Sequence, residues 1–184
     1  MDVTPLSIPD VLLIHPKRFG DDRGWFEETW NQKRLFDAGL DVTFVQDNQS
    51  LSRSIGTIRG LHFQAPPFEQ AKLVRVAQGS VLDVAVDLRA SSPTYGQWVS
   101  AELSAHNGAQ LFVPRGFAHA FCTKAPDTVV CYKVDGFYDK GSEGGIRFDD
   151  PNLKIDWGLG DNDAVLSEKD LALGTLKDLP AIFS

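Results

Sequence analysis

The sequence predicts an all-β fold, either a sandwich or a jelly-roll barrel, with little helix. Short runs rich in Val, Ile, Phe and Thr are separated by turns, and the chain contains 16 Gly and 10 Pro. Within several of these runs apolar and polar residues alternate, as they do on the two faces of a strand. Many short strands joined by Gly- and Pro-containing turns are typical of such folds.

The expected elements include one clear helix, Asn31–Ala38, because Asn31 can cap its start and Gly39 can end it. A turn at Gly79 predicts a hairpin between the strands on either side. A second, short helix is expected at Ser167–Ala172. The strands are expected at the short apolar run Val11–Ile14 and at Val42–Asn48, Gly56–Gln64, Lys72–Gln78, Val81–Leu88, Gln97–Leu103, Gln110–Val113, Ala118–Thr123 and Thr128–Val134.

The strand Val81–Leu88 has one apolar face and one mixed face. The apolar face carries Leu82, Val84, Val86 and Leu88, and the mixed face carries Asp83, Ala85 and Asp87. A mixed face of this kind indicates either the working interior of a barrel or a surface in contact with solvent.

The composition is that of an ordinary globular protein, with 42% hydrophobic and 23% charged residues among 184, which predicts one domain over residues 1–184. No apolar run is long enough to span a bilayer, and the first residues do not form a secretory signal. Cys122 and Cys131 are expected to be reduced thiols, so we expect a cytoplasmic protein. The net charge of −7 argues against binding to nucleic acid, but a few arginines can still hold an anionic small ligand.

Two of the four histidines stand in patterns typical of cupins. His119 follows Gly108, Pro114 and Gly116 at the spacing of one cupin half-motif, and His62 follows Gly56 at the spacing of the other. Metal-binding cupins have a further histidine two residues after the first, and here that residue is Gln64. This replacement weakens a metal site, although a set consisting of His62, Glu69 and His119 remains an alternative.

A wider resemblance is carried by motifs that follow one another along the chain at matching spacing. They are Phe19–Glu28, Phe44–Ser50, Arg59–Gln64, Gln70–Val74, Asp83–Arg89, Ser92–Trp98, Pro114–His119 and Tyr132–Lys133. Over roughly residues 10–171 the chain resembles the dTDP-4-dehydrorhamnose 3,5-epimerase family. One departure is Ala120, where the family usually has glycine.

The resemblance implies a cupin-type jelly-roll β-barrel with a few short peripheral helices, acting as a homodimer. It implies a nucleotide-sugar substrate, dTDP-4-dehydro-6-deoxy-glucose, whose C3 and C5 are inverted in dTDP-L-rhamnose biosynthesis. It implies no metal and no cofactor. The N-terminal strands are expected to pair with the barrel of the partner.

Four residues match the catalytic positions of the family. Both inverted carbons lie next to the C4 ketone, so their protons can be removed to give an enolate. His62 matches the base, since imidazole titrates near neutral pH, and Tyr132 matches the acid on the opposite face of the ring. Lys72 matches the group that stabilises the charge developing on O4. Asp170 matches the carboxylate that orients His62, with Asp83 as the alternative.

Other positions match those that bind the substrate in the family. Arg23 and Arg59 suit bidentate recognition of phosphate, and Tyr138 matches the residue that stacks on thymine. Lys72 also counts among the contacts, and the remaining matches are Glu28, Gln46, Asp47, Asn48, His119, Glu143 and Lys169.

Three alternatives remain open from the sequence. A related epimerase could invert only C3 or only C5, or act on another deoxysugar nucleotide, with the same base and acid. A metal-dependent cupin could use the alternative ligand set. A sugar-binding jelly roll without activity would need no base and acid, so the presence of both His62 and Tyr132 argues against it.

Overall fold

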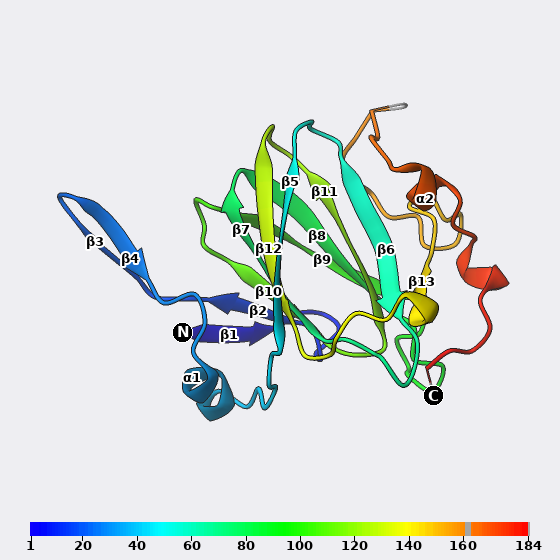
Figure 1. Cartoon of the computed structure of the whole chain (residues 1–184), viewed down its shortest axis with the longest axis horizontal. Helices are drawn as coiled ribbons and strands as arrows, with labels where there is room; N and C mark the ends of the chain where they lie inside the picture. Colours follow the sequence, from blue (N-terminus) through cyan, green and yellow to red (C-terminus); the bar gives the residue numbers. More distant parts are fainter. Residues whose placement is uncertain (161–162, 184) are drawn as a thin grey trace.

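The computed structural model describes residues 1–160 and 163–183, which fold into two antiparallel sheets that face each other (Figure 1). The first sheet contains, in spatial order, β1 (Asp2–Pro5), β2 (Leu12–His15), β10 (Gln110–Val113), β7 (Lys72–Gln78), β12 (Thr128–Val134) and β5 (Gln46–Ser52). The second contains β13 (Glu143–Gly145), β6 (Ile58–Gln64), β11 (Phe117–Thr123), β8 (Ser80–Asp87) and β9 (Trp98–Ser104).

A separate hairpin of β3 (Arg18–Asp21) and β4 (Gly24–Glu27) projects from the body as an arm (Figure 1). The helices are short: α1 spans Gln32–Asp37, α2 spans Glu168–Leu171, and two 3₁₀ turns, η1 and η2, span Lys140–Ser142 and Leu176–Asp178. Two facing antiparallel sheets with short peripheral helices confirm the predicted all-β jelly roll. In the described part of the chain, no helix is both long and apolar enough to cross a membrane.

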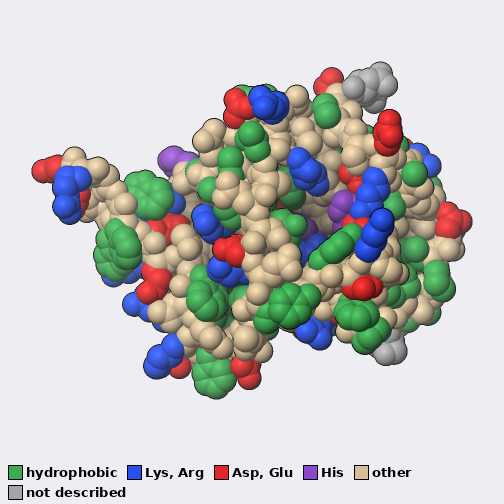
Figure 2. Space-filling view, in the orientation of Figure 1, with side chains coloured by type: hydrophobic (Ala, Val, Ile, Leu, Met, Phe, Trp, Pro, Cys, Tyr) green, Lys and Arg blue, Asp and Glu red, His purple; other side chains and the backbone are tan. Residues whose placement is uncertain are grey.

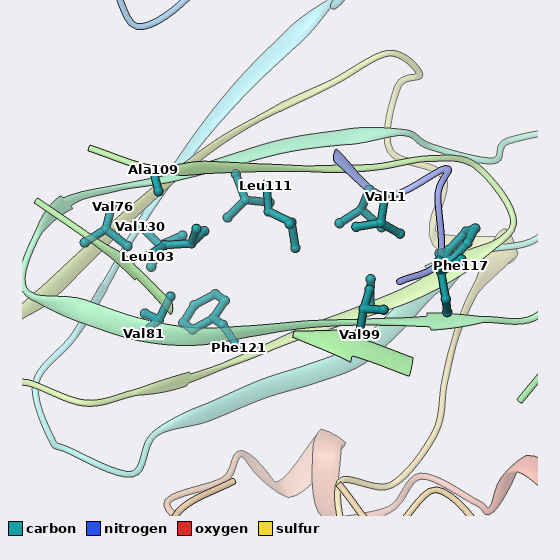
Figure 3. Packing of buried hydrophobic residues seen from close by; sticks show 14 residues of the cluster. Val11, Val76, Val81, Val99, Leu103, Ala109, Leu111, Phe117, Phe121 and Val130 are labelled. Atoms are coloured by element: carbon teal, nitrogen blue, oxygen red, sulfur yellow. The ribbon is translucent and has the colours of Figure 1, made fainter. Parts of the chain in front are cut away.

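The main core lies between the two sheets (Figure 3). Val76, Leu111 and Val130 enter it from the first sheet, and Val81 and Phe121 enter it from the second. All five side chains are buried, and Val81, Leu111 and Val130 have no accessible surface. This apolar layer fixes the distance between the sheets, and therefore between any side chains that face inward from opposite sheets.

The outer face of each sheet is also covered. Leu153, Trp157 and Phe183 belong to the C-terminal segment and pack with Val84 and Val86 of β8 on the outside of the second sheet. On the first sheet, Leu35 and Leu40, from α1 and the residues after it, cover Leu73 and Phe112. The C-terminal segment therefore sits close enough to the second sheet to add a residue to a site there.

This packing shows whether the mixed face of β8 lies inside the fold or in contact with solvent. Val84 and Val86 pack outward, whereas Val81 and Ala85 belong to the core between the sheets. Because alternate residues of a strand share a face, Asp83 points into the same interior. The mixed face is the inside of the fold.

Gly60 allows β6 and β11 to approach closely. Its φ is +127°, and a Cβ added there would lie 2.5 Å from the Cβ of Ala120. Glycine is therefore required at this position. The two strands then pair with His62 directly opposite His119, and the register shifts between His119 and Phe121.

The structure agrees with the predicted bounds of Lys72–Gln78, Gln110–Val113 and Thr128–Val134, and it shifts several others by one or two residues. The strand expected at Val42–Asn48 was placed too early, because pairing with β12 begins at Gln46 and continues to Ser52.

The hairpin expected at Gly79 was wrong. β7 pairs with β10 and β12, whereas β8 pairs with β11 and β9. The chain therefore crosses from one sheet to the other at this glycine, whose φ is +80°.

Candidate active site

A cavity of about 520 Å³ opens between the two sheets and the C-terminal segment. A second hollow of about 300 Å³ adjoins it, and His62, Lys72 and Tyr132 line both. In Figure 2 a histidine side chain is visible within a hollow of the surface, with Lys and Arg side chains around it. The three shared residues therefore stand at the junction of a site with two lobes.

Strands of both sheets place these side chains. His62 comes from β6 and His119 from β11, both in the second sheet. Lys72 and Tyr132 come from β7 and β12 of the first sheet, where Lys72 pairs with Val134, two residues from Tyr132. Residues related in this way lie on one face of a sheet, within reach of each other. The histidines and the Lys–Tyr pair thus approach the cavity from opposite sheets.

Asp170 on α2 contacts His62, with 2.6 Å between Oδ1 and Nε2. Burial lowers the pKa of His62, and this effect outweighs the charge and the hydrogen bond of Asp170, which act in the opposite direction. The ring is therefore neutral at neutral pH. The hydrogen bond assigns the proton to Nε2, which leaves Nδ1 as the basic nitrogen.

A second histidine–aspartate pair lies beside the first. Nε2 of His119 is 2.8 Å from Oδ1 of Asp83, and both side chains are buried. Of the two carboxylates considered from the sequence, Asp170 is thus the one that contacts His62. Oδ2 of Asp83 is buried without a hydrogen-bond partner among the described residues.

Lys72 carries a positive charge in a site that disfavours it. Burial lowers the pKa of Lys72 to about 8, although the charges of Asp83 and Glu143 act to raise it. The amine is therefore mostly protonated at pH 7. A cation that is partly removed from water interacts strongly with any negative charge that develops beside it.

Tyr132 is suited to donate a proton. Burial raises the pKa of Tyr132 and the charge of Arg59 opposes this, so the phenol stays protonated at neutral pH. Arg59 lies at the edge of the larger lobe, where its guanidinium donates to Oγ of Ser52 and to the carbonyl oxygen of Leu51, both at 3.1 Å. These bonds fix a cation beside the phenol.

The smaller lobe is lined mainly by polar side chains, including Gln46, Asn48, Tyr138 and Glu143. The hydroxyl of Tyr138 donates to Oε2 of Glu143 at 3.0 Å, and Lys169 of α2 forms an ion pair with the same carboxylate. The Tyr138 side chain is exposed, with 56% of its surface accessible, so a face of its ring is available to a flat ligand.

Three of the residues expected from the sequence lie outside both lobes. Arg23 stands on the arm and pairs with Asp21, and Glu28, after the arm, lies beside Arg34. Asp47 pairs with Lys133 at 2.8 Å on the outside of the first sheet. The other expected residues line one lobe or both.

Gln64, at the second histidine position of metal cupins, has a different use here. Its amide nitrogen donates to the carbonyl oxygens of Phe68 and Phe137, at 2.6 and 3.2 Å, and its oxygen accepts the N–H of Asp139 at 2.7 Å. The buried amide thus joins the two loops beside the smaller lobe. Sequence reasoning missed this function, because the partners are backbone groups.

The alternative metal set is not assembled. Nε2 of each histidine already contacts a carboxylate, and Glu69 lines neither lobe. Within residues 1–160 and 163–183, no three His, Cys, Asp or Glu side chains are grouped closely enough to hold a metal ion.

Sequence reasoning also missed Ser167 and Phe121, which line the larger lobe.

Comparison with known proteins decides the family. The sequence profile of dTDP-4-dehydrorhamnose 3,5-epimerases matches residues 5–178. The chain belongs to the dTDP-4-dehydrorhamnose 3,5-epimerase family. The members of this family are isomerases that invert carbon centres of dTDP-sugars.

Individual members of the family match almost the whole chain. The dTDP-4-dehydrorhamnose 3,5-epimerase of Sinorhizobium fredii is 53% identical over 97% of this chain and 91% of its own length. A structure from Legionella pneumophila, in complex with dTDP-4-keto-L-rhamnose, has a TM-score of 0.93 at 42% identity, covering 98% of this chain and 95% of the other. A structure from Bacillus anthracis, with TDP and PPi bound, has a TM-score of 0.92 at 48% identity, covering 95% and 99%.

Proposed function

We propose that the protein inverts C3 and C5 of dTDP-4-dehydro-6-deoxy-glucose, a step in dTDP-L-rhamnose biosynthesis. The observation that carries this proposal is the pairing of a neutral His62, held by Asp170, with a protonated Tyr132 from the facing sheet. A base and an acid on opposite sides of one cavity are what inversion at carbon requires.

Each inversion removes one proton and returns one to the other face. Nδ1 of His62 takes the proton from a carbon next to the C4 ketone, and the electron pair moves onto O4. The Lys72 ammonium stabilises this oxygen, because it is a half-buried cation that lines both lobes of the site. The Tyr132 hydroxyl then protonates the carbon from the side of the first sheet. As this C–H bond forms, the electron pair returns from O4 to the carbon. His62 then gives its proton to solvent and Tyr132 takes one up, which resets both groups for the second carbon. The reaction involves proton transfers and no net electron transfer, so it requires no redox cofactor, and the Lys72 ammonium supplies at O4 the positive charge that a metal would otherwise supply.

We assign the nucleotide part of the substrate to the residues around the two lobes. Arg59 is held in place for a charge-assisted bond to phosphate. Tyr138 offers its ring to thymine, and Glu143 and Lys169 fix the position of this tyrosine and of α2. The other contacts are assigned to Gln46, Asn48 and His119, which line the same lobes.

A homodimer would explain the arm. Phe19, Trp25 and Phe26 are 50%, 60% and 68% exposed on this hairpin, an unusual number of aromatic side chains for a surface in water. Seating the arm on a second copy would cover them and bring Arg23 and Glu28 to the site of the partner. Light scattering at micromolar concentration tests this assembly, and a fully active monomer would contradict it.

The state of the two cysteines supports a reducing compartment, and we propose the cytoplasm. Cys122 and Cys131 are both buried and free. Burial raises the pKa of Cys122, which keeps its thiol protonated and unreactive. Fractionation of cells that produce the protein would check this location.

Nuclear magnetic resonance in D2O tests the function directly. With dTDP-4-dehydro-6-deoxy-glucose as substrate, deuterium should enter at both C3 and C5, and the product should be inverted at both carbons. Exchange and inversion at one carbon only would identify an enzyme with narrower action. The absence of turnover would contradict the proposal.

A further inference from the structure

Asp170 is held at both of its carboxylate oxygens. Oδ1 contacts Nε2 of His62 at 2.6 Å, and Oδ2 accepts the hydroxyl of Ser167 at 2.9 Å. Oγ of Ser167 in turn accepts the backbone N–H of Asp170 at 3.1 Å. The three residues therefore form a chain of hydrogen bonds from Ser167 through the buried carboxylate to the imidazole.

The local sequence explains how the serine reaches the aspartate. Ser167 is the N-cap of α2, and Asp170 is three residues further on, at a position where a carboxylate usually bonds back to the N–H of the cap residue. That usual arrangement occurs nearby, where Asp178 accepts the N–H of Thr175 at 2.9 Å. Both aspartates accept the hydroxyl of their own cap residue. The difference is that Asp170 contacts His62, whereas Asp178 accepts the N–H of its cap residue, so the cap of α2 is joined to the site.

A carboxylate with one partner can turn about its last side-chain bond, because this torsion has a broad minimum. A second hydrogen bond removes that freedom. The direction matters here, since Oδ1 must accept from Nε2 of His62 to keep the proton there and leave Nδ1 basic. If Asp170 turned away, the proton could move to Nδ1, and the ring could no longer act as a base on the side of the substrate.

We propose that Ser167 is a positioning residue that acts through Asp170 to hold His62 in its basic form. The proposal rests on the proposed function, in which His62 removes the proton. Because the Ser167 hydroxyl hydrogen goes to Oδ2 of Asp170, its contribution to the reaction should disappear when that carboxylate is removed.

A double-mutant cycle tests this dependence. Ser167→Ala should lower kcat on the order of tenfold, as expected for the loss of a hydrogen bond to a charged group, with little change in KM. In an Asp170→Ala background the same substitution should change kcat by less than about twofold. Ser167→Thr, which keeps the hydroxyl, should restore most of the activity. An equal loss in both backgrounds, or full activity of Ser167→Ala, would overturn the proposal.

Thr175→Ala is the matched control, because it removes a hydroxyl bonded to an aspartate at a turn outside the site. It should leave kcat unchanged, and comparable melting temperatures would show that each variant folds. Loss of kcat in this control equal to that in Ser167→Ala would assign the effect to the C-terminal segment as a whole, against the proposal.

A second measurement does not depend on the substrate. The ring protons of His62 can be titrated by nuclear magnetic resonance in the free protein. Burial lowers the pKa of His62, and the charge and hydrogen bond of Asp170 act to raise it. If Asp170 turns away when its bond to Ser167 is lost, this contribution weakens, so Ser167→Ala should lower the pKa of His62 further, in the same direction as Asp170→Ala. The double variant should match Asp170→Ala alone. An unchanged or raised pKa in Ser167→Ala would refute the positioning role even if the proposed reaction were wrong.

Discussion

His62 and His119 are direct partners across neighbouring strands, and each imidazole is held at Nε2 by its own aspartate, at 2.6 and 2.8 Å. The pairs differ in access, since the His62 side chain is 29% exposed and that of His119 only 8%. They also differ in origin, because Asp83 lies inside the fold and Asp170 comes from the C-terminal segment. The more accessible ring is therefore the one assigned as base.

His62→Ala and Tyr132→Phe should fail in different ways. His62→Ala removes the base and should abolish both inversion and solvent exchange at C3 and C5. Tyr132→Phe keeps the base, so deuterium can return to the original face and exchange should continue while inversion falls by about 10²–10⁴-fold. Exchange and inversion are both measured by nuclear magnetic resonance in D2O. Inversion by Tyr132→Phe at the unmodified rate would show that another group is the acid.

The pH dependence of kcat/KM should be bell-shaped. His62 must be neutral to accept a proton, so activity should rise with pH through a pKa below the usual value of about 6.5. Lys72 must be charged to stabilise O4, so activity should fall as pH rises past about 8. Lys72→Arg keeps its charge at high pH, and whatever activity it retains should lack the alkaline limb. An unchanged limb in this variant would assign it to another group.

Arg59→Ala should weaken the binding of dTDP. The loss of a charge-assisted hydrogen bond costs roughly 1.5–3 kcal/mol, which corresponds to roughly a 10- to 150-fold increase in Kd. Calorimetric titration measures this change, and Arg147→Ala is the control, because Arg147 is exposed and paired with Asp149 outside both lobes. In the proposed dimer, Arg23→Ala should have a similar effect. Unchanged affinity in both site variants would make these arginines structural.

Activity should survive exhaustive treatment with EDTA. The side chains that a metal cupin would use are already engaged, since Gln64 bonds to the backbone and both histidines bond to aspartates. The rate before and after chelation is the measurement. A loss of activity that a divalent metal restores would contradict the proposed chemistry.

The inner strands of both sheets could be predicted from the sequence to within one or two residues. The bounds of β7, β10 and β12 agree with the expectation, and those of β8 and β11 differ from it by one residue. Strands with a neighbour on each side are rich in apolar and β-branched residues, which makes them visible in the sequence. Val42 and Phe44 looked like strand residues, but they pack into the cluster beneath α1 and precede the pairing of β5. The alternation of apolar and polar residues in the strands before and after Gly79 does not indicate which sheet each strand joins, so the sequence could not show that the two strands lie in different sheets.

The site could be predicted only in part. The resemblance brought His62, Lys72, Tyr132 and Asp170 into consideration and gave Asp170 as the carboxylate that orients His62, with Asp83 as the alternative. It did not indicate that Asp83 contacts His119. Ser167 was hidden, because a serine three residues before an aspartate at the start of a helix looks like an ordinary cap.

The distance along the chain between His62 and Asp170 has a consequence during translation. The two residues are 108 positions apart, and all strands from β5 to β12 are complete before Asp170 is added. At ordinary elongation rates Asp170 follows the end of β12 by roughly 2–7 s, and domains can begin to fold while they are made. The strands around the cavity are therefore present in the nascent chain while its base still lacks its aspartate. The segment that supplies Asp170 also supplies Leu153, Trp157 and Phe183, which cover the outer face of the second sheet, so completion of the site is tied to completion of that sheet.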